Sequence, residues 1–329
     1  MTLEAEADAS PQPLLLDVDG LSVRFRTDDG DVMAVKDVKF QLSHRETLCL
    51  LGESGSGKTV TMRALMRLLP PTARIEGSVL LDGIDVLALD RKGLQRVRGS
   101  TAAMIFQDPM AALDPVYTIG TQIIQAIVAH GGVSRKSART RAIELLEMVQ
   151  IPAASRRLDA YPHELSGGLR QRAMIALALS CRPKLLLADE PTTALDATVQ
   201  IQVLLLLREL QHELGMAMMI VTHDLGVACE VADRVAVMYA GQFVETSTIS
   251  ALIDDPRHPY SIGLLASTVD DGARGKALTP IPGAPPDLAH LPQGCAFAPR
   301  CSRALQICTQ QAPPFVNIEI GRQARCHLV

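Results

Sequence analysis

The sequence has no apolar run long enough to cross a membrane, because no stretch approaches the ~18 consecutive apolar residues that a spanning helix needs. Its first residues, MTLEAEADASPQP, are acidic and lack the basic and apolar segments of a secretory signal peptide. A basic excess is also missing, since 32 Lys and Arg residues stand against 36 Asp and Glu residues. These absences argue against a membrane-spanning, a secreted and a nucleic-acid-binding protein. We therefore expect a cytoplasmic protein in which residues 1–13 form a disordered tail.

The composition predicts a folded protein. Hydrophobic residues make up 47% of the chain and charged residues 21%, which favours a packed core over disorder. A length of 329 residues suits one large domain or two smaller ones. There is no internal repeat and no run of coiled-coil heptads. The seven cysteines are expected to stay reduced in the cytoplasm unless they bind a metal.

The stretch LCLLGESGSGKTVTMRALMRLLPP, residues 48–71, fits the phosphate-loop pattern G-x-x-x-x-G-K-[ST]. Residues 48–51 are expected to form a buried strand, and residues 60–69 a helix that two prolines end. In this setting, loop N–H groups and the helix N-terminus bind phosphate oxygens. Lys58 would reach the β- and γ-phosphates, and the Thr59 hydroxyl would bind Mg²⁺. The residues expected to hold the nucleotide here are Gly52, Ser54, Gly55, Ser56, Gly57, Lys58, Thr59 and Val60.

A second motif, KLLLADEP, supplies two carboxylates at the end of an apolar strand. Asp189 is expected to bind the Mg²⁺ ion, directly or through water. Glu190 follows by one residue, where it could polarise a water that attacks the γ-phosphate. The alternative is a strand that merely ends in solvated acids, which is common. Beside a matching phosphate loop, the catalytic interpretation is favoured.

The chain divides into three stretches. Residues 14–82 show strand patterns around the phosphate loop, and residues 87–181 show mainly helical patterns, such as TRAIELLEMVQI with its apolar face. KLLLADEP, MAMMIVTHD and DRVAVMYAG then return as buried strands, separated by helical patterns such as VQIQVLLLLRELQHEL. Alternating strands and helices predict a parallel sheet, with the ligand at the carboxyl ends of the strands.

The segment ELSGGLRQR, residues 164–172, resembles the signature sequence of ATP-binding cassette (ABC) ATPases. Other family elements follow the family order: Gln107 resembles the Q-loop glutamine, residues 191–196 the D-loop, and His223 the switch histidine. Phe25 stands where that family has the aromatic residue that stacks on adenine. The resemblance implies a P-loop NTPase core of α/β class in residues 14–265, with a parallel sheet, an antiparallel β part and a helical subdomain at about 106–180. It also implies that ATP is the nucleotide and that Gln107 helps to bind Mg²⁺.

The same resemblance implies a head-to-tail dimer in which each ATP lies between one chain's phosphate loop and the other chain's signature. Ser166, Gly167 and Gly168 would then contact the γ-phosphate of a nucleotide that a partner holds. The family signature is commonly LSGGQ, whereas the fifth position here is Leu169. We expect at most a modest weakening from the loss of one amide side chain.

The sequence after residue 253 resembles the ATPase subunits of oligopeptide and dipeptide importers, through DDPRHPYSIGLL, PGAPPDL and GCAFAPRCSRALQIC. This resemblance implies two membrane-spanning permease subunits, a second, paralogous ATPase subunit and a solute-binding protein as partners. It places the chain at the cytoplasmic face of the inner membrane. Relatives with this tail also import nickel, glutathione or oligosaccharides. An ABC ATPase of nucleic acid is disfavoured because the gap between loop and signature is short, and a translation-type ABC protein because only one phosphate loop is present.

Four cysteines cluster in the Pro-rich and Cys-rich segment 266–329, with the spacing C-x5-C-x6-C-x17-C. Four thiolates in a tail with little apolar content predict a metal site that replaces a hydrophobic core. Zinc is an alternative, but its structural sites usually include a closer cysteine pair. The resemblance implies a [4Fe–4S] cluster on Cys295, Cys301, Cys308 and Cys326. Cys49, Cys181 and Cys229 are expected to be ordinary core or near-core residues.

Overall fold

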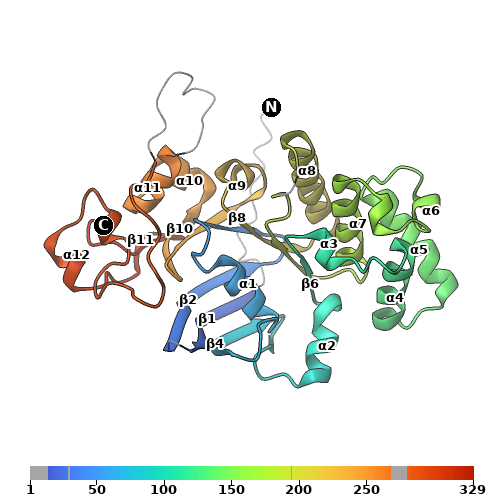
Figure 1. The fold of residues 1–329 in the computed structure, drawn as a ribbon, viewed down its shortest axis with the longest axis horizontal. Coiled ribbons are helices and arrows are strands. Elements are labelled where there is room, and N and C mark those ends of the chain that lie inside the picture. The colour runs from blue at the N-terminus through green and yellow to red at the C-terminus, as the bar shows by residue number, and fades with distance from the viewer. Residues whose placement is uncertain (1–13, 29, 194, 268–279) are drawn as a thin grey trace, which may run out of the picture.

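The computed structural model describes residues 14–28, 30–193, 195–267 and 280–329 (Figure 1). The expected disordered tail at residues 1–13 lies outside this part of the chain. The expected Cys-rich segment 266–329 is described except for residues 268–279.

A mixed sheet forms the centre of the molecule, with the order β11-β12-β10-β9-β3-β8-β7-β6. Its strands from β9 to β6 are parallel, and the strands on the other side of β9 pair antiparallel. Their bounds are β3 Thr47–Leu51, β6 Ala102–Ile105, β7 Leu185–Asp189, β8 Ala217–Thr222, β9 Arg234–Tyr239, β10 Gln242–Thr248, β11 Val316–Glu319 and β12 Arg322–Ala324. The parallel strands are almost wholly apolar because helices or a second sheet cover both of their faces.

A second sheet of four antiparallel strands packs below the first, in the order β2-β1-β4-β5. Its strands are β1 Leu14–Thr27, β2 Gly30–Ser43, β4 Ala73–Leu81 and β5 Ile84–Asp85. The helix α1, Lys58–Leu65, lies between the two sheets (Figure 1) and buries Met62, Ala64 and Leu65 in their shared core. Because side chains alternate along a strand, Leu185 and Leu187 of β7 enter this core while Leu186 and Ala188 enter the core on the opposite face.

A helical region is inserted between β6 and β7 and projects to one side of the sheet (Figure 1). It contains α3 Pro109–Ala112, α4 Ile119–Gly131, α5 Arg135–Met148, α6 Ala154–Arg157, the 3-10 turn Pro162–Glu164 and α7 Gly167–Leu179. Its core also includes apolar residues of α8, Ala197–Leu214. The apolar face expected in TRAIELLEMVQI is confirmed, since Ala142, Leu145, Leu146 and Val149 are all buried.

The C-terminal segment, residues 280–329, packs at the end of the sheet opposite to the helical region (Figure 1). Its elements are the 3-10 turn Ala298–Arg300, α12 Gln306–Gln310 and the hairpin of β11 and β12, of which β12 pairs with β10. Phe297 packs there against Tyr239 and Tyr260. The remaining helices are α2 Arg91–Ser100, α9 Leu225–Val231, α10 Ile249–Asp254 and α11 Pro259–Ala266.

Most expected strands and helices are present, with two differences. The strand β6 was not expected, because its four residues lie within a stretch whose pattern is mainly helical. Helix α1 ends at Leu65 rather than at Leu69, since Arg67 adopts a left-handed conformation (φ 49°) and Leu68 N–H donates to the Arg63 carbonyl. Among the cysteines expected to be core or near-core residues, Cys49 is buried and Cys181 is half-buried, but Cys229 is exposed on α9, so this interpretation is wrong for Cys229.

Candidate functional site

A cavity of about 700 Å³ lies at the carboxyl ends of the parallel strands. Its wall contains the whole loop between β3 and α1, together with Gln107, Glu190 and His223. These three residues follow β6, β7 and β8, so three neighbouring strands deliver them to the same edge of the sheet. The position agrees with the general rule for ligand sites in open α/β sheets.

The loop between β3 and α1 requires glycine at two positions. A Cβ atom at Gly52 would lie 2.3 Å from the Met238 carbonyl oxygen. Gly57 has a φ of 106°, and a Cβ atom there would lie 2.7 Å from the Ala34 carbonyl oxygen. Larger residues would therefore push the loop away from β9 and β2 and change the shape of the cavity.

The N-terminus of α1 opens into this cavity without a side-chain cap. Across the described ranges, the N–H groups of Lys58, Thr59 and Val60 make no hydrogen bond to another backbone group. Lys58 Nζ donates to the carbonyl oxygens of Gly52 (2.7 Å) and Glu53 (2.8 Å), and burial lowers the pKa of this amine. Free helix N–H groups beside a buried lysine make an anion-binding site suited to phosphate.

The expected Mg²⁺ ligands Thr59 and Asp189 lie side by side. Thr59 Oγ1 donates to Asp189 Oδ1 over 2.7 Å. The other carboxylate oxygen, Oδ2, is buried and accepts no hydrogen bond within the described residues, although Arg63 lies 3.6 Å away. Burial raises the pKa of Asp189, against the Thr59 hydrogen bond. A buried carboxylate oxygen without a hydrogen bond, beside a threonine hydroxyl, fits a hard divalent cation such as Mg²⁺.

Of the three side chains expected to act in catalysis, Gln107 and His223 both contact the third, the Glu190 carboxylate. Glu190 Oε2 accepts hydrogen bonds from Gln107 Nε2 (2.9 Å) and from Thr193 Oγ1 (2.8 Å). Glu190 Oε1 lies 3.3 Å from His223 Nδ1. The network orients a carboxylate whose side chain is 15% exposed toward the cavity. Such an arrangement can hold a water molecule and accept its proton.

Glu190 also has an unusual backbone. Its φ is 47°, in the left-handed region that residues with a Cβ atom rarely adopt. The Glu190 N–H donates to the Val221 carbonyl of β8 over 3.0 Å, which holds this conformation against the sheet. Strained residues of this kind concentrate at functional sites, because the surrounding structure must enforce them.

The signature residues are not brought to this cavity. Ser166 caps α7 by accepting a hydrogen bond from Leu169 N–H, and both Ser166 and Gly167 are exposed. None of Ser166, Gly167 and Gly168 lines the cavity of their own chain. Leu169, the atypical fifth position, packs partly buried against the core of the helical region.

Phe25 is also absent from the cavity wall. It lies near the end of β1, opposite Val32 and Ala73, and packs partly buried on the core beneath α1. In contrast, Ala34, Leu264 and Leu288 line the cavity and were not expected. Leu288 is the last residue of PGAPPDL, a segment noted above for its resemblance to importer ATPases, and that resemblance did not indicate a contact with the nucleotide cavity.

The expected metal centre in the C-terminal segment is not assembled. In the described parts of the chain, no group of three or more His, Cys, Asp or Glu side chains could hold a metal ion. Burial raises the pKa of the Cys295, Cys301 and Cys326 thiols, and the Cys308 thiol adds to each shift. Leu305 N–H donates to Cys308 Sγ, and Leu328 N–H donates to Cys326 Sγ, both over 3.4 Å.

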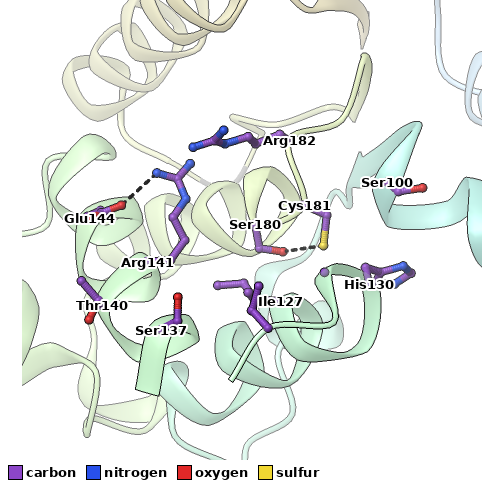
Figure 2. A pocket seen from close by; sticks show the side chains of 12 residues that line it. Ser100, Ile127, His130, Ser137, Thr140, Arg141, Glu144, Ser180, Cys181 and Arg182 are labelled. Atoms are coloured by element: carbon purple, nitrogen blue, oxygen red, sulfur yellow. Dashed lines mark hydrogen bonds and ion pairs between the residues drawn. The ribbon is translucent and has the colours of Figure 1, made fainter. Parts of the chain in front are cut away.

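Another cavity, of about 580 Å³, lies between α4, α5 and the end of α7. Figure 2 shows Arg141 and Arg182 at its wall, with Arg141 donating to Glu144 over 3.1 Å. None of the residues expected to bind nucleotide, or to act on it, lines this cavity. The loop cavity is therefore the candidate site.

Comparisons with known proteins agree with this geometry. Residues 35–193 match the ABC transporter family, and residues 244–308 match the oligopeptide/dipeptide transporter C-terminal region. The oligopeptide transport ATP-binding protein OppD of Salmonella typhimurium is 47% identical over 99% of this chain and 98% of its own. OppD of Bacillus subtilis is 50% identical over 92% of this chain and 86% of its own. A putative peptide import ATP-binding protein of Brucella melitensis is 49% identical over 96% of this chain and 97% of its own.

Solved structures show the same fold. The dimeric ATP-binding cassette MJ0796, bound to ADP and phosphate, has a TM-score of 0.64 and 29% identity, over 71% of this chain and 99% of that one. The protein cbiO1 of Clostridium perfringens has a TM-score of 0.63 and 27% identity, over 74% of this chain and 92% of that one.

Proposed function

Since the chain belongs to the ABC ATPases of the oligopeptide and dipeptide importer family, we propose that it binds and hydrolyses ATP to power peptide import across the cytoplasmic membrane. The observation that carries the proposal is the convergence of Gln107 and His223 on Glu190, beside the phosphate loop. Nickel, glutathione and oligosaccharides remain alternative cargoes, because the cargo pocket lies in other subunits.

In the proposed reaction, the residues of the cavity divide between binding the nucleotide and activating the water. The free N–H groups of α1 and the Lys58 amine would bind the β- and γ-phosphates. Thr59, Asp189 and Gln107 would hold Mg²⁺, which would supply positive charge to offset that of these phosphates. Glu190 orients the attacking water and takes its proton. His223 and Gln107 hold the Glu190 carboxylate in place and contact the region of the γ-phosphate. Phe25 remains the proposed adenine contact.

The signature supports a head-to-tail dimer. Ser166, Gly167 and Gly168 are exposed or partly exposed at the start of α7, away from their own nucleotide cavity. A second ATPase subunit would place them against the γ-phosphate of its nucleotide, which closes the dimer in the ATP-bound state and opens it after hydrolysis. We propose that this second subunit is a related but distinct chain. A transport-competent complex with two copies of this chain and no paralogue would contradict that assignment.

Membrane partners would dock on the helical region. Exposed apolar side chains gather after β6, at Phe106, Met110, Val116 and Tyr117, where a short helix of a permease subunit could pack. Two permease subunits and a solute-binding protein would complete the transporter, and this chain would sit at the cytoplasmic face of the membrane. No described helix is both long and apolar enough to cross a bilayer.

A nucleic-acid ABC ATPase is less well supported. Those proteins carry a large insertion between the phosphate loop and the signature, but the described helices in that interval have at most 14 residues. The net charge of −4 also gives no basic excess of the kind that is usual in nucleic-acid-binding proteins.

We further propose that residues 266–329 form a C-terminal domain that carries a [4Fe–4S] cluster on its four cysteines, with Zn²⁺ as the alternative. Four cysteines are a ligand set that suits such a cluster, and two of them, Cys308 and Cys326, accept backbone N–H groups. Anaerobic purification with iron, sulfide and zinc analysis and a visible spectrum tests it. Cys301→Ser should lose the metal, while the control Cys229→Ser, on exposed α9, should keep it. A colourless protein with one equivalent of zinc rejects the cluster, and a metal-free, fully active protein rejects both.

The catalytic assignment is tested with Glu190→Gln, which keeps the shape of the side chain and removes its charge. In the assembled transporter it should bind ATP normally and hydrolyse it about a hundredfold more slowly, the range for a positioned general base. Lys58→Ala should instead weaken ATP binding itself. Glu213→Gln, on the exposed face of α8, is the control and should match the wild type. Hydrolysis by Glu190→Gln at the wild-type rate would show that the assignment is wrong.

A further inference from the structure

The C-terminal segment reaches the phosphate loop through one buried side chain. Arg300 donates from both terminal nitrogens to the Glu53 carboxylate, over 2.7 Å to Oε2 and 2.9 Å to Oε1. Its Nε donates to the Pro282 carbonyl, and the Tyr239 hydroxyl lies 3.3 Å from one terminal nitrogen. The Arg300 side chain is only 6% exposed, so this two-point ion pair is shielded from solvent.

Glu53 is the second residue of the phosphate loop, and its other groups are also engaged. Its N–H donates to the Tyr260 hydroxyl over 2.8 Å. Its carbonyl accepts hydrogen bonds from Lys58 Nζ (2.8 Å) and from Ser56 N–H (3.2 Å). Glu53 therefore contacts both Arg300, through its carboxylate, and Lys58, the lysine expected to bind the phosphates, through its carbonyl.

The position of Arg300 is set by aromatic packing. Its guanidinium lies 5.8 Å from the Tyr239 ring centre and 5.9 Å from that of Phe297. Phe297 is 4% exposed and packs edge-on against Tyr239, whose ring is 5.2 Å away. This packing leaves the guanidinium few alternative positions, which favours a fixed contact with the loop.

Glu53 also poses an electrostatic problem for a phosphate site. It lines the nucleotide cavity and its side chain is 25% exposed. An unpaired carboxylate in this position would repel the triphosphate, because the cavity wall has a lower dielectric constant than water. The two-point ion pair with Arg300 offsets this charge.

We propose that Arg300 is a positioning residue for the nucleotide site, which neutralises Glu53 and holds the phosphate loop, so that the C-terminal segment sets the affinity for ATP. The inference rests on the proposed function, since it assigns a determinant of ATP affinity at the same cavity. A change at the neighbouring Cys301 that loosens the C-terminal segment would therefore also loosen the phosphate loop, through Arg300 and Glu53.

The test is ATP binding to the full-length protein, measured by titration calorimetry with Mg²⁺ present. Arg300→Gln should weaken ATP binding by about tenfold, within the usual range for coupled sites. Adding Glu53→Gln should restore most of that loss, because it removes the charge that Arg300 had balanced. Arg300→Lys keeps the charge but not the two-point geometry, so its ATP affinity should lie between those of the wild type and Arg300→Gln. This variant replaces Arg300→Gln in the test if Arg300→Gln does not fold.

Arg322→Gln is the matched control. Arg322 lies in the same segment, is also 6% exposed and also pairs with two carboxylates, those of Glu245 and Asp255, but it does not touch the loop. The Arg322→Gln variant should have a lower thermal stability than the wild type and the same affinity for ATP.

Three results would overturn the proposal: wild-type ATP affinity in Arg300→Gln, no recovery on adding Glu53→Gln, or an equal loss of affinity in Arg322→Gln. The failure of the proposed function is distinguishable, because the wild-type protein would then bind no ATP, or Lys58→Ala would bind it equally well.

Discussion

The central sheet and the C-terminal segment are stabilised in different ways. In β3, β7 and β8 every residue is buried, and both faces of each strand meet apolar neighbours. The C-terminal segment has short strands and few buried apolar side chains, among them Phe297, Cys308 and Ala324. Aromatic packing, two buried arginines and the pairing of β12 with β10 hold it in place.

This difference matters for the nucleotide cavity because both regions build it. The sheet supplies the loop and the acidic and polar residues at the strand ends, whereas the C-terminal segment supplies Leu288 and, through Glu53, the Arg300 contact. A change in the sheet should therefore affect the whole fold. A change in the segment should affect the cavity while leaving the sheet folded.

The largest effect is expected from a cavity in the sheet. Leu50 of β3 is fully buried in the core shared by both sheets. Leu50→Ala should lower the free energy of unfolding by about 2–5 kcal/mol, because it removes apolar contacts and leaves a void. Urea denaturation measures this loss. Ile307→Ala, on the exposed side of α12 in the C-terminal segment, should change it by less than about 0.5 kcal/mol, and equal losses would contradict the distinction.

A smaller effect should appear with pH at the junction of the two regions. His258 is 1% exposed, caps α11 by accepting the Tyr260 N–H, and packs on Phe297. Burial lowers its pKa from 6.5 to about 3. The unfolded chain therefore binds a proton that the folded chain does not, and stability falls as the pH drops below 6.5 toward 3, by at most about 1.4 kcal/mol per pH unit.

His258→Asn keeps an acceptor for the cap and removes the titration. Thermal or urea unfolding between pH 7 and pH 5 should show a shallower loss of stability in this variant than in the wild type. His290→Asn, at an exposed position, is the control. An unchanged slope in His258→Asn would exclude the buried histidine as the cause.

The smallest effect is expected at the atypical signature position. Leu169 packs partly buried against the helical core, so Leu169→Gln exchanges a modest apolar contact for one amide that can face a partner's nucleotide. The hydrolysis rate of the assembled transporter should change by less than about fivefold, which is under 1 kcal/mol in activation free energy. A change of more than tenfold would show that this side chain acts on the reaction itself.

Local motifs were sufficient for most of the candidate site. The phosphate loop could be predicted because its glycines, lysine and flanking strand and helix lie within about twenty residues of one another. Gln107, Glu190 and His223 could be predicted from their motifs, but not their mutual contacts, which need three strands to lie side by side. Strand β6 was missed because four apolar residues do not distinguish a strand from a helix.

The sequence alone therefore determined the chemistry of the phosphate loop, since close neighbours in the chain impose its turn, its free N–H groups and its charge. Only the tertiary structure decided what surrounds that loop. Glu53 and Arg300 are 247 positions apart, and no local pattern links an acid in a glycine-rich loop to an arginine beside a cysteine. They meet because β12 extends the central sheet and Phe297 packs on Tyr239, and burial of the Arg300 side chain then favours its pairing with the Glu53 carboxylate.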